Sequence, residues 1–392
     1  MAAESFHADR SFFAPAFRIK LNGQDTGREV IADVLELSFT DDLENIDSFE
    51  FVLNDWDPVR LRPKFSSPWD ESGRLLTLSP GGLPVPVFEP GAGVSLFMGY
   101  AEEGDLPFIM DGEVVSLSPS FPASGAPTCR VRALDAFQRG LQKIHVEGNY
   151  SGTAKAIVDQ LCRENDVTVQ WSNVEEEGAE EEDVDIEGIL YEEIQKRAEG
   201  YGLSMMTIPA SGEDSKPTLF LSAPSEDTSP PVADFVWGRT LISFTPVLSA
   251  KGQVAEVVVR WGDPDADGGG RIEVTKTWSD IGLSPSALGP AGQADIDTAV
   301  RGLREVIKPE NIRTKADASR AALAHLRALA ATLITGSGSS IGLPTLRAGK
   351  TVTLSGLGAR FDGTWRLTQT THAIGGGGYT TNFQARKEVL NG

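Results

Sequence analysis

The chain has 392 residues, a length that predicts two or three domains of about 100–200 residues each. Its formal net charge of −21 argues against nucleic acid and anionic membranes as ligands, because binding phosphate groups needs a basic surface. No stretch approaches the ~20 apolar residues of a membrane span, and the N-terminus lacks the apolar core of a signal peptide.

Cysteine is rare in this sequence. Cys129 and Cys162 are the two cysteines of the chain, too few for a disulfide framework in a protein of this length. This usage suits folding in a reducing cytoplasm. We expect both residues to be buried and to act as small apolar side chains.

The first part of the chain predicts β structure. Residues 1–15 are expected to form a flexible arm, and a strand over residues 17–21 ends at an Asn22-Gly23 turn. Residues 31–39 place Ile31, Leu35, Leu37 and Phe39 on one face, which predicts a second strand. A strand over residues 49–53 follows an acidic loop and is expected to pair with it.

Residues 57–92 are rich in proline and glycine, and we expect a long loop that contacts a neighbouring subunit. Three strands are then predicted, over residues 93–100, 108–115 and 129–134. The middle strand contains the dipeptide Asp111-Gly112.

The central section predicts helices. Five apolar residues at i, i+3, i+4, i+7 and i+8 indicate an amphipathic helix that Ser151 or Thr153 can cap: Ala154, Ile157, Val158, Leu161 and Cys162. A short strand over residues 167–171 precedes a second helix that starts near residue 189, whose face carries Leu190, Ile194, Ala198 and Tyr201.

An acidic run, residues 175–185, separates these two helices. Its charges repel one another, which predicts a solvated loop. The run lacks the alternating ligand positions and the central glycine of an EF-hand loop, so we predict no calcium site there.

A linker rich in Ser, Pro and Asp, residues 223–232, leads to the last section. Strands are predicted over residues 241–247, 254–261 and 272–278, with a turn at 263–270 and an irregular stretch at 279–313. An alanine-rich helix over residues 315–334 would bury Ala322, Leu326, Leu329 and Leu333, and Gly336–Ser340 would end it.

The C-terminal region predicts three antiparallel strands, within residues 341–354, 361–368 and 378–383. Turns are expected at Asp362-Gly363 and at the four glycines 375–378, because glycine suits positive φ. The same order of features occurs near residue 100, which predicts a duplicated β-unit. The expected equivalences are Val94 with Val352, Leu96 with Leu354, Asp111-Gly112 with Asp362-Gly363, and Val131 with Phe383.

No catalytic constellation is predicted. The four histidines, His7, His145, His325 and His372, are scattered without metal-ligand spacing, and His372 is expected to be structural. The glycine-rich stretches match no phosphate-binding loop, and no nucleophile elbow occurs. We therefore predict no catalytic, cofactor-binding or metal-binding residues.

The C-terminal pattern resembles the phage late-control D family, the hub of contractile tail baseplates, whose domain also forms the N-terminal part of type VI secretion spike proteins. The helix ending in Ala198-Glu199-Gly200-Tyr201-Gly202 and the early Asn54-Asp55 also resemble this family. The C-terminal match rests on the following residues: Pro344, Leu346, Gly349, Val352, Asp362, Gly363, Trp365, Leu367, His372, Gly378, Tyr379, Thr381 and Phe383.

The resemblance implies a mainly β fold with α+β insertions, in which two similar β-barrel modules flank a small helical/αβ section. The expected domains are residues 1–145, 146–225 and 226–392. The implied function is that of a homotrimeric adaptor, assembled in the bacterial cytoplasm, between a sixfold inner tube and a threefold spike on a separate chain. Other baseplate proteins are expected partners, and no cofactor is expected. Two alternatives remain: a cell-wall or polysaccharide hydrolase on a β scaffold, and a tail tube subunit.

Overall fold

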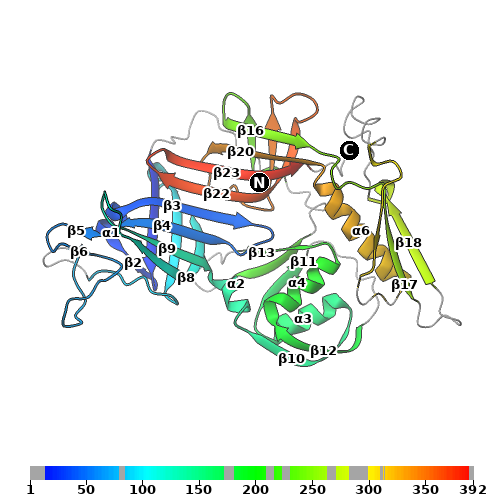
Figure 1. The fold of residues 1–392 in the computed structure, drawn as a ribbon, viewed down its shortest axis with the longest axis horizontal. Helices are drawn as coiled ribbons and strands as arrows, with labels where there is room; N and C mark the ends of the chain where they lie inside the picture. The colour runs from blue at the N-terminus through cyan, green and yellow to red at the C-terminus, as the bar shows by residue number, and fades with distance from the viewer. Residues whose placement is uncertain are drawn as a thin grey trace.

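The computed structural model describes residues 14–78, 84–171, 181–208, 216–222, 230–262, 271–281, 299–309, 312 and 314–387. The protein is mainly β, and one continuous sheet of 13 strands runs through two β-modules (Figure 1). The mainly β fold class predicted from the sequence is confirmed. No helix among the described residues combines the length and apolar character that crossing a membrane would require.

The first β-module is built from strands whose side chains alternate between core and solvent. In β4, for example, Phe49, Phe51 and Leu53 are buried while their neighbours are partly exposed. Its main strands are β1 (Pro15–Leu21), β3 (Val34–Asp42), β4 (Ser48–Asn54), β7 (Gly93–Tyr100), β8 (Phe108–Ser120) and β9 (Thr128–Asp135). The short elements are β2 (Gln24–Asp25), α1 (Gly27–Asp33), β5 (Trp56–Asp57), β6 (Arg62–Pro63) and the 3-10 helix η1 (Ala101–Glu103).

Two predictions for this module are wrong in part. Residues 31–33 belong to helix α1, so the strand predicted from residue 31 starts at Val34, and Leu35 is exposed. The described part of the 57–92 stretch is not structureless, because it contains β5 and β6 and buries Phe65, Val85 and Phe88 in the module core. These apolar side chains hold the stretch against the core of the first module.

The second β-module repeats this construction with strands from the C-terminal half of the chain. They are β15 (Ala233–Val236), β16 (Leu241–Leu248), β20 (Ile334–Ile341), β21 (Thr351–Ser355), β22 (Gly363–Gly375) and β23 (Gly378–Lys387). The predicted glycine turn is confirmed, since β22 and β23 are joined by Gly376 and Gly377. The glycine-serine stretch after the helix was predicted to be a helix stop but lies inside strand β20.

A layer of helices and strands is inserted between strands β16 and β20 of this module. Helix α6 (Lys315–Ala331) packs on the sheet of β17 (Glu256–Gly262), β18 (Arg271–Thr277) and β19 (Arg304–Ile307), with η2 (Trp278–Ile281) beside it. The helix starts with a full capping box between Thr314 and Asp317. Strand β19 falls in the stretch predicted to be irregular, and the predicted turn at 263–270 lies outside the described residues.

The section between the modules is a small α+β unit. Both predicted helices are confirmed as α3 (Ala154–Glu164) and α4 (Leu190–Gly200), and Thr153 caps α3. The remaining elements are α2 (Ala136–Leu141), β10 (His145–Gly152), β11 (Thr168–Trp171), β12 (Glu181–Ile189), β13 (Ser204–Ile208) and β14 (Thr218–Ser222). The acidic run was predicted to be a loop, but its last five residues, 181–185, belong to β12, and its earlier residues lie outside the described chain.

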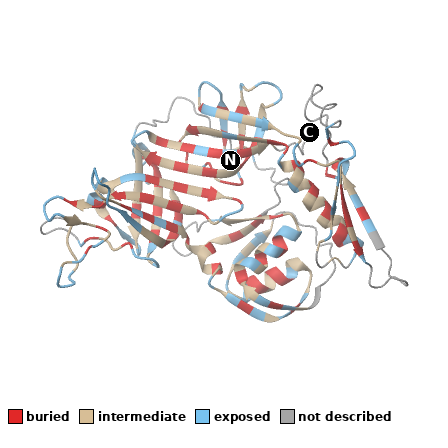
Figure 2. Ribbon diagram, viewed as in Figure 1, coloured by how far each residue is buried: buried red, intermediate tan, exposed pale blue. Residues whose placement is uncertain are grey.

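Buried side chains gather in three clusters, one in each β-module and one in the small α+β unit (Figure 2). Ile374 and Tyr379, which belong to strands of the second module, pack in the core of the first. The core of the first module therefore depends on residues more than two hundred positions away in the chain. Residues 1–13 of the predicted arm and most of the linker at 223–232 lie outside the described residues, and the last residue of that arm, Pro15, belongs to β1.

Candidate functional site

The sheet itself is the candidate functional site, because its two halves have the same topology. In each module, six strands taken in chain order lie in the sheet as first, fourth, fifth, sixth, third, second. In the first module this order is β1-β7-β8-β9-β4-β3, and in the second it is β15-β21-β22-β23-β20-β16. One pairing differs, since β1 runs antiparallel to β7 whereas β15 runs parallel to β21. The predicted pair of similar β-units is confirmed by this order.

The residue registers of the two modules agree as well. Val94 pairs with Gly112, and Val352 pairs with Trp365. Two residues further along, Val114 stands opposite Ala133 and Leu367 opposite Ala385, and a β-bulge follows each of these pairs. This register makes Val131 equivalent to Phe383, as predicted.

A second bulge also recurs at the same place. It lies between Val34 and Glu36 in β3, and between Leu241 and Ser243 in β16. The residues that it leaves unpaired, Leu35 and Ile242, are both exposed, by 49% and 58%. Bulges bend a strand and re-aim its side chains, so their recurrence gives the two sheets the same local shape.

Glycines at equivalent positions lie two residues before the fourth strand of each module, β7 and β21. Gly91 has a φ of 93° and Gly349 a φ of 82°, a backbone conformation that L side chains rarely adopt. Each donates its N–H to the residue before the bulge, Gly91 to the Val114 carbonyl and Gly349 to the Leu367 carbonyl, both over 2.8 Å.

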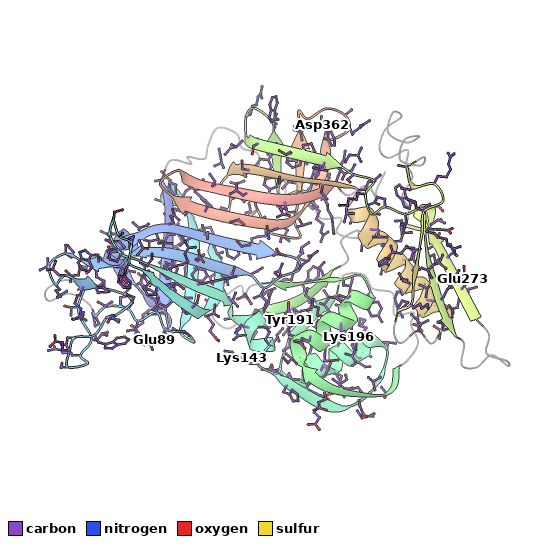
Figure 3. All side chains as sticks on the ribbon, viewed as in Figure 1. Glu89, Lys143, Tyr191, Lys196, Glu273 and Asp362 are labelled. Atoms are coloured by element: carbon purple, nitrogen blue, oxygen red, sulfur yellow. The ribbon has the colours of Figure 1, made fainter. Side chains whose placement is uncertain are left out.

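One predicted equivalence is wrong. Asp111-Gly112 lies inside strand β8, two positions out of register with Asp362-Gly363, which marks the start of β22. Gly112 is favoured by space rather than by a turn, since a Cβ there would lie 3.0 Å from the Phe49 ring, a tight contact. Asp362, labelled in Figure 3, accepts a hydrogen bond from Leu357 N (2.7 Å), and Gly363 has a φ of 123°.

The two modules are joined edge to edge at a seam. Strand β22 of the second module pairs antiparallel with β3 of the first, from Gln369 opposite Asp42 to Ile374 opposite Leu37. In the middle of the seam the hydroxyls of Thr371 and Thr40 lie 3.3 Å apart. The intramolecular seam is thus an ordinary antiparallel ladder between strands of successive modules.

A buried cluster of charges fixes one end of the seam. Arg347 forms an ion pair with Asp41, its Nη2 lies 3.7 Å from Asp47 Oδ2, and its Nη1 donates to the Ile109 carbonyl over 3.2 Å. Burial raises the pKa of Asp47 well above its usual value, and the neighbouring Asp41 raises it further. Burial alone would lower the pKa of Arg347, but Asp41 and Asp47 raise it, so the guanidinium stays charged.

The buried His372 side chain stabilises the middle of the seam, where it lies opposite Phe39. A carbonyl oxygen only accepts hydrogen bonds, so the Nε2–H of His372 donates to the Leu346 carbonyl (2.7 Å). Nδ1 of the neutral ring then accepts from the hydroxyls of Tyr379 (2.9 Å) and Thr381 (3.1 Å). Burial, followed by the nearby Arg347 charge, lowers the pKa of His372 to about 4. The imidazole is therefore neutral and structural, as expected for this residue.

A shallow hollow of about 340 Å³ lies on the sheet of the second module, and its walls are mostly uncharged hydroxyl and amide side chains. Ser243 and Ser339 hydrogen bond across strands at 2.8 Å, and Gln384 donates to Gln369 at 2.9 Å. The polar residues of the hollow are Ser243, Thr245, Ser337, Ser339, Gln369, Thr371, Asn382 and Gln384.

The other titratable residues named in the sequence do not come together. His145 lies on β10 and His325 on α6, where its Nε2 is 3.2 Å from Glu305, while His7 lies outside the described residues. Within the described chain no three His, Cys, Asp or Glu side chains form a group suited to a metal ion. Cys129 and Cys162 are buried free thiols, and burial raises the pKa of each to about 12.

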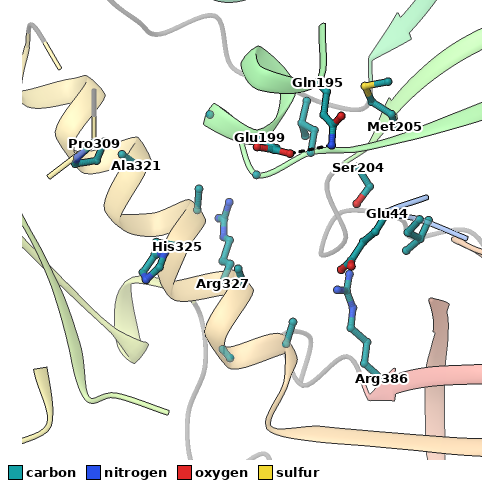
Figure 4. Close-up of a pocket in the computed structure, with 18 of the residues that line it drawn as sticks. Glu44, Gln195, Glu199, Ser204, Met205, Pro309, Ala321, His325, Arg327 and Arg386 are labelled. Carbon is teal, nitrogen blue, oxygen red and sulfur yellow. Dashed lines mark hydrogen bonds between the residues drawn. The ribbon is translucent and has the colours of Figure 1, made fainter. Parts of the chain in front are cut away.

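A cavity of about 790 Å³ lies between helices α4 and α6 (Figure 4). Its wall includes Glu199, which accepts a hydrogen bond from Gln195 (3.1 Å), together with Ser204, His325 and Arg327. A second carboxylate, that of Glu44, also lines the cavity.

Comparisons with known proteins identify solved structures with a similar fold. No protein-family model and no curated protein matches the sequence. Among solved structures, the 43 kDa tail protein of prophage MuSo2 from Shewanella oneidensis is similar over 96% of this chain and 99% of its own, with a TM-score of 0.65 and 13% identity. The tail protein from Neisseria meningitidis MC58 is similar over 96% and 98%, with a TM-score of 0.62 and 13% identity.

A third similar structure is the Escherichia coli c3393 protein, described as a component of the type VI secretion system. It is similar over 95% of this chain and 80% of its own, with a TM-score of 0.50 and 12% identity. The chain therefore has the fold shared by phage tail proteins and a type VI secretion component, in agreement with the family resemblance of its residue patterns.

Proposed function

We propose that this protein is the structural hub of a contractile tail or injection system, a homotrimer that adapts a sixfold inner tube to a threefold spike. The observation that carries the proposal is the duplicated sheet, in which strand order, register and both bulges recur. The fold shared with phage tail proteins supports it.

The argument is one of symmetry. A closed trimer of a chain with two similar modules presents six similar modules around one axis, while the remaining parts of each chain keep threefold symmetry. Such a particle can contact a ring of six subunits at one end and a trimer at the other without straining either interface. The polar, uncharged lining of the hollow on the second module suits a surface that remains in contact with water.

The proposal includes the partners and the domains predicted from the sequence. The hub would contact an inner tube protein above, a separate spike protein below and other baseplate proteins, after assembly in the bacterial cytoplasm. We propose three domains: 1–145 and 226–392 as the β-modules, and 146–225 between them. We propose no catalytic role, and turnover of cell-wall material by the purified protein would contradict this part.

Light scattering of the purified protein tests the proposal. We expect a species of about 126 kDa, three times the 42.0 kDa of the chain, that binds purified tube protein. A monomer at all concentrations that binds neither a tube nor a spike protein would contradict the hub. A hexamer of about 252 kDa that polymerises into tubes would favour the tube subunit instead.

A further inference from the structure

A cavity of about 290 Å³ lies where the two β-modules and the small α+β unit meet. Its wall is formed by residues of β8 and α2, by Thr207 of β13 and by Arg347 of the second module. Apolar side chains make up much of this wall, and three carboxylates and a guanidinium supply its charges. The apolar wall residues include Phe108, Ile109, Met110, Phe137 and Pro217, and the charged ones are Asp47, Asp111, Asp135 and Arg347.

We infer that this cavity binds a primary ammonium group on an alkyl stem, such as a lysine side chain of a partner protein or one end of a free polyamine. The ammonium would lie among Asp47, Asp111 and Asp135, and the stem would contact the apolar wall. All of these residues belong to one chain, so the site does not depend on the proposed trimer.

The charges around the cavity are unbalanced. Arg347 already forms an ion pair with Asp41, and its Nη2 lies 3.7 Å from Asp47 Oδ2. Asp135 is only 6% exposed, yet neither Asp135 nor Asp111 forms an ion pair with any described residue. A buried carboxylate without a cation is costly, and burial raises the pKa of Asp135 to about 6. A bound cation would offset this cost.

Buried acceptors at the cavity also lack donors. Asp47 is 5% exposed, and the distance of its Oδ2 from Arg347 is beyond hydrogen-bond range. Gln138 is 4% exposed, and its Nε2 donates to the wall residue Thr207 over 3.0 Å. Its Oε1 is buried and accepts no hydrogen bond within the part of the chain that the structure describes. Buried acceptors are normally satisfied, so these atoms indicate a ligand that donates hydrogen bonds.

The arrangement of the oxygens favours an ammonium over other cations. The described carboxylates form no group suited to a metal ion. Oδ1 of Asp47 accepts the Asp42 N–H (3.1 Å), and Oδ1 of Asp135 accepts the Gln138 N–H (2.7 Å). Neither buried carboxylate therefore presents two free oxygens to the planar fork of a guanidinium. An ammonium has three donors that point in different directions, and its alkyl stem suits an apolar wall.

Thermal unfolding of the purified chain at pH 8 with n-butylammonium chloride tests the site. We expect a saturable rise in Tm, of roughly 2 °C at ten times the dissociation constant. Sodium chloride and tetramethylammonium chloride at the same ionic strength should give no saturable rise, because neither cation has an N–H to donate. Methylguanidinium chloride should bind more weakly than n-butylammonium.

Three variants locate the binding. Asp135→Asn keeps the N-cap of α2 and should weaken n-butylammonium binding at least ~tenfold, because a buried charged acceptor is lost. Asp111→Asn, at an exposed position, should weaken it roughly two- to fivefold. Asp234→Asn removes the same charge from an exposed position on β15 and should change nothing. Equal effects of the three substitutions, or no rise in Tm beyond that given by sodium chloride, would overturn the inference.

Carbodiimide coupling distinguishes the two sources of the ammonium, because the reagent joins carboxylates to amines that contact them. In the native assembly, a peptide containing Asp111 coupled to a lysine of another polypeptide would assign the ammonium to that partner, and excess n-butylammonium should suppress the coupling. Binding of n-butylammonium to the purified chain, with no such coupled peptide in the assembly, would assign the site to a free amine. Both results support the ammonium site, and both leave the oligomeric state of the protein to its own test.

Discussion

At the scale of single residues, two buried titratable groups give the stability of this protein opposite dependences on pH. His372 is neutral in the folded chain because its pKa is lowered to about 4, whereas an unfolded imidazole has a pKa near 6.5. Its contribution to stability is therefore present above pH about 6.5 and is lost as pH falls toward about 4, by up to about 3 kcal/mol.

A His372→Gln variant isolates this contribution. We expect it to be less stable than the parent at pH 7, by about 1–3 kcal/mol, because partners of the imidazole lose their hydrogen bonds. Its deficit should shrink as pH falls from 6.5 to 4. Urea unfolding at several pH values measures both effects, and a deficit that stays constant with pH would contradict a depressed pKa for His372.

Asp135 behaves in the opposite sense. Burial raises the pKa of its carboxyl to about 6, above the value of about 3.9 for an unfolded aspartate. Its contribution is fully present below pH about 4 and is lost as pH rises through about 6. The side chain also accepts a hydrogen bond from Gln138 N at the start of α2 (2.7 Å), a role that asparagine can take over.

The difference in free energy of unfolding between Asp135→Asn and the parent should therefore favour the variant more at pH 7 than at pH 4, by up to about 3 kcal/mol. The same unfolding series gives this difference. If parent and variant show parallel pH curves between pH 4 and 7, the burial of an ionisable Asp135 has no energetic consequence and the prediction is wrong.

At the scale of elements, strand β20 shows that the two modules place their large side chains differently on two facing strands. In the first module Leu37 faces Phe51, and in the second the equivalent pair is Phe244 and Gly338. The phenylalanine of the pair lies on β4 in the first module and on β16 in the second, where the Phe244 ring covers the glycines of β20. A Cβ on Gly338 would lie 2.7 Å from the Ser243 carbonyl oxygen and 2.8 Å from the Phe383 ring.

Gly338→Ala should consequently destabilise the protein by about 1–3 kcal/mol, the usual cost of overpacking a core. Ser337→Ala is a matched control on the same strand, because Ser337 is exposed, and should change the free energy of unfolding by less than about 0.5 kcal/mol. Equal effects of the two substitutions on denaturant unfolding would show that the close packing around Gly338 does not constrain the strand.

The same strand shows what the sequence could and could not predict. Strands with strict alternation, such as β4 and the part of β22 near Trp365, were predictable, as were helices α3 and α4 with their apolar faces. Strand β20 carries glycine and serine where alternation needs apolar residues, so its pattern indicated a helix stop. Its apolar contribution comes from Phe244 on the neighbouring strand, which the local sequence does not reveal.

Long-range pairing was the other limit. The seam joins residues more than three hundred positions apart, and the Arg347–Asp41 pair depends on it, so no local spacing points to either. The duplication was predictable from Val94, Val131 and their counterparts. At the Asp-Gly dipeptides the predicted register failed, because these dipeptides coincide in composition but occupy different places in the two modules.

At the scale of the whole molecule, two similar modules in one chain are the central feature. A sheet with the same topology repeated twice has the same edge available twice, and the chain itself uses that edge once, between β22 and β3. This repetition is the observation on which the proposed trimer rests.

End-on averaged electron micrographs of the purified protein test this claim most directly. The account predicts a closed ring with threefold symmetry in which six similar lobes surround the axis, two from each chain. A ring of six whole chains with strict sixfold symmetry, or isolated particles that show no ring at any concentration, would contradict it.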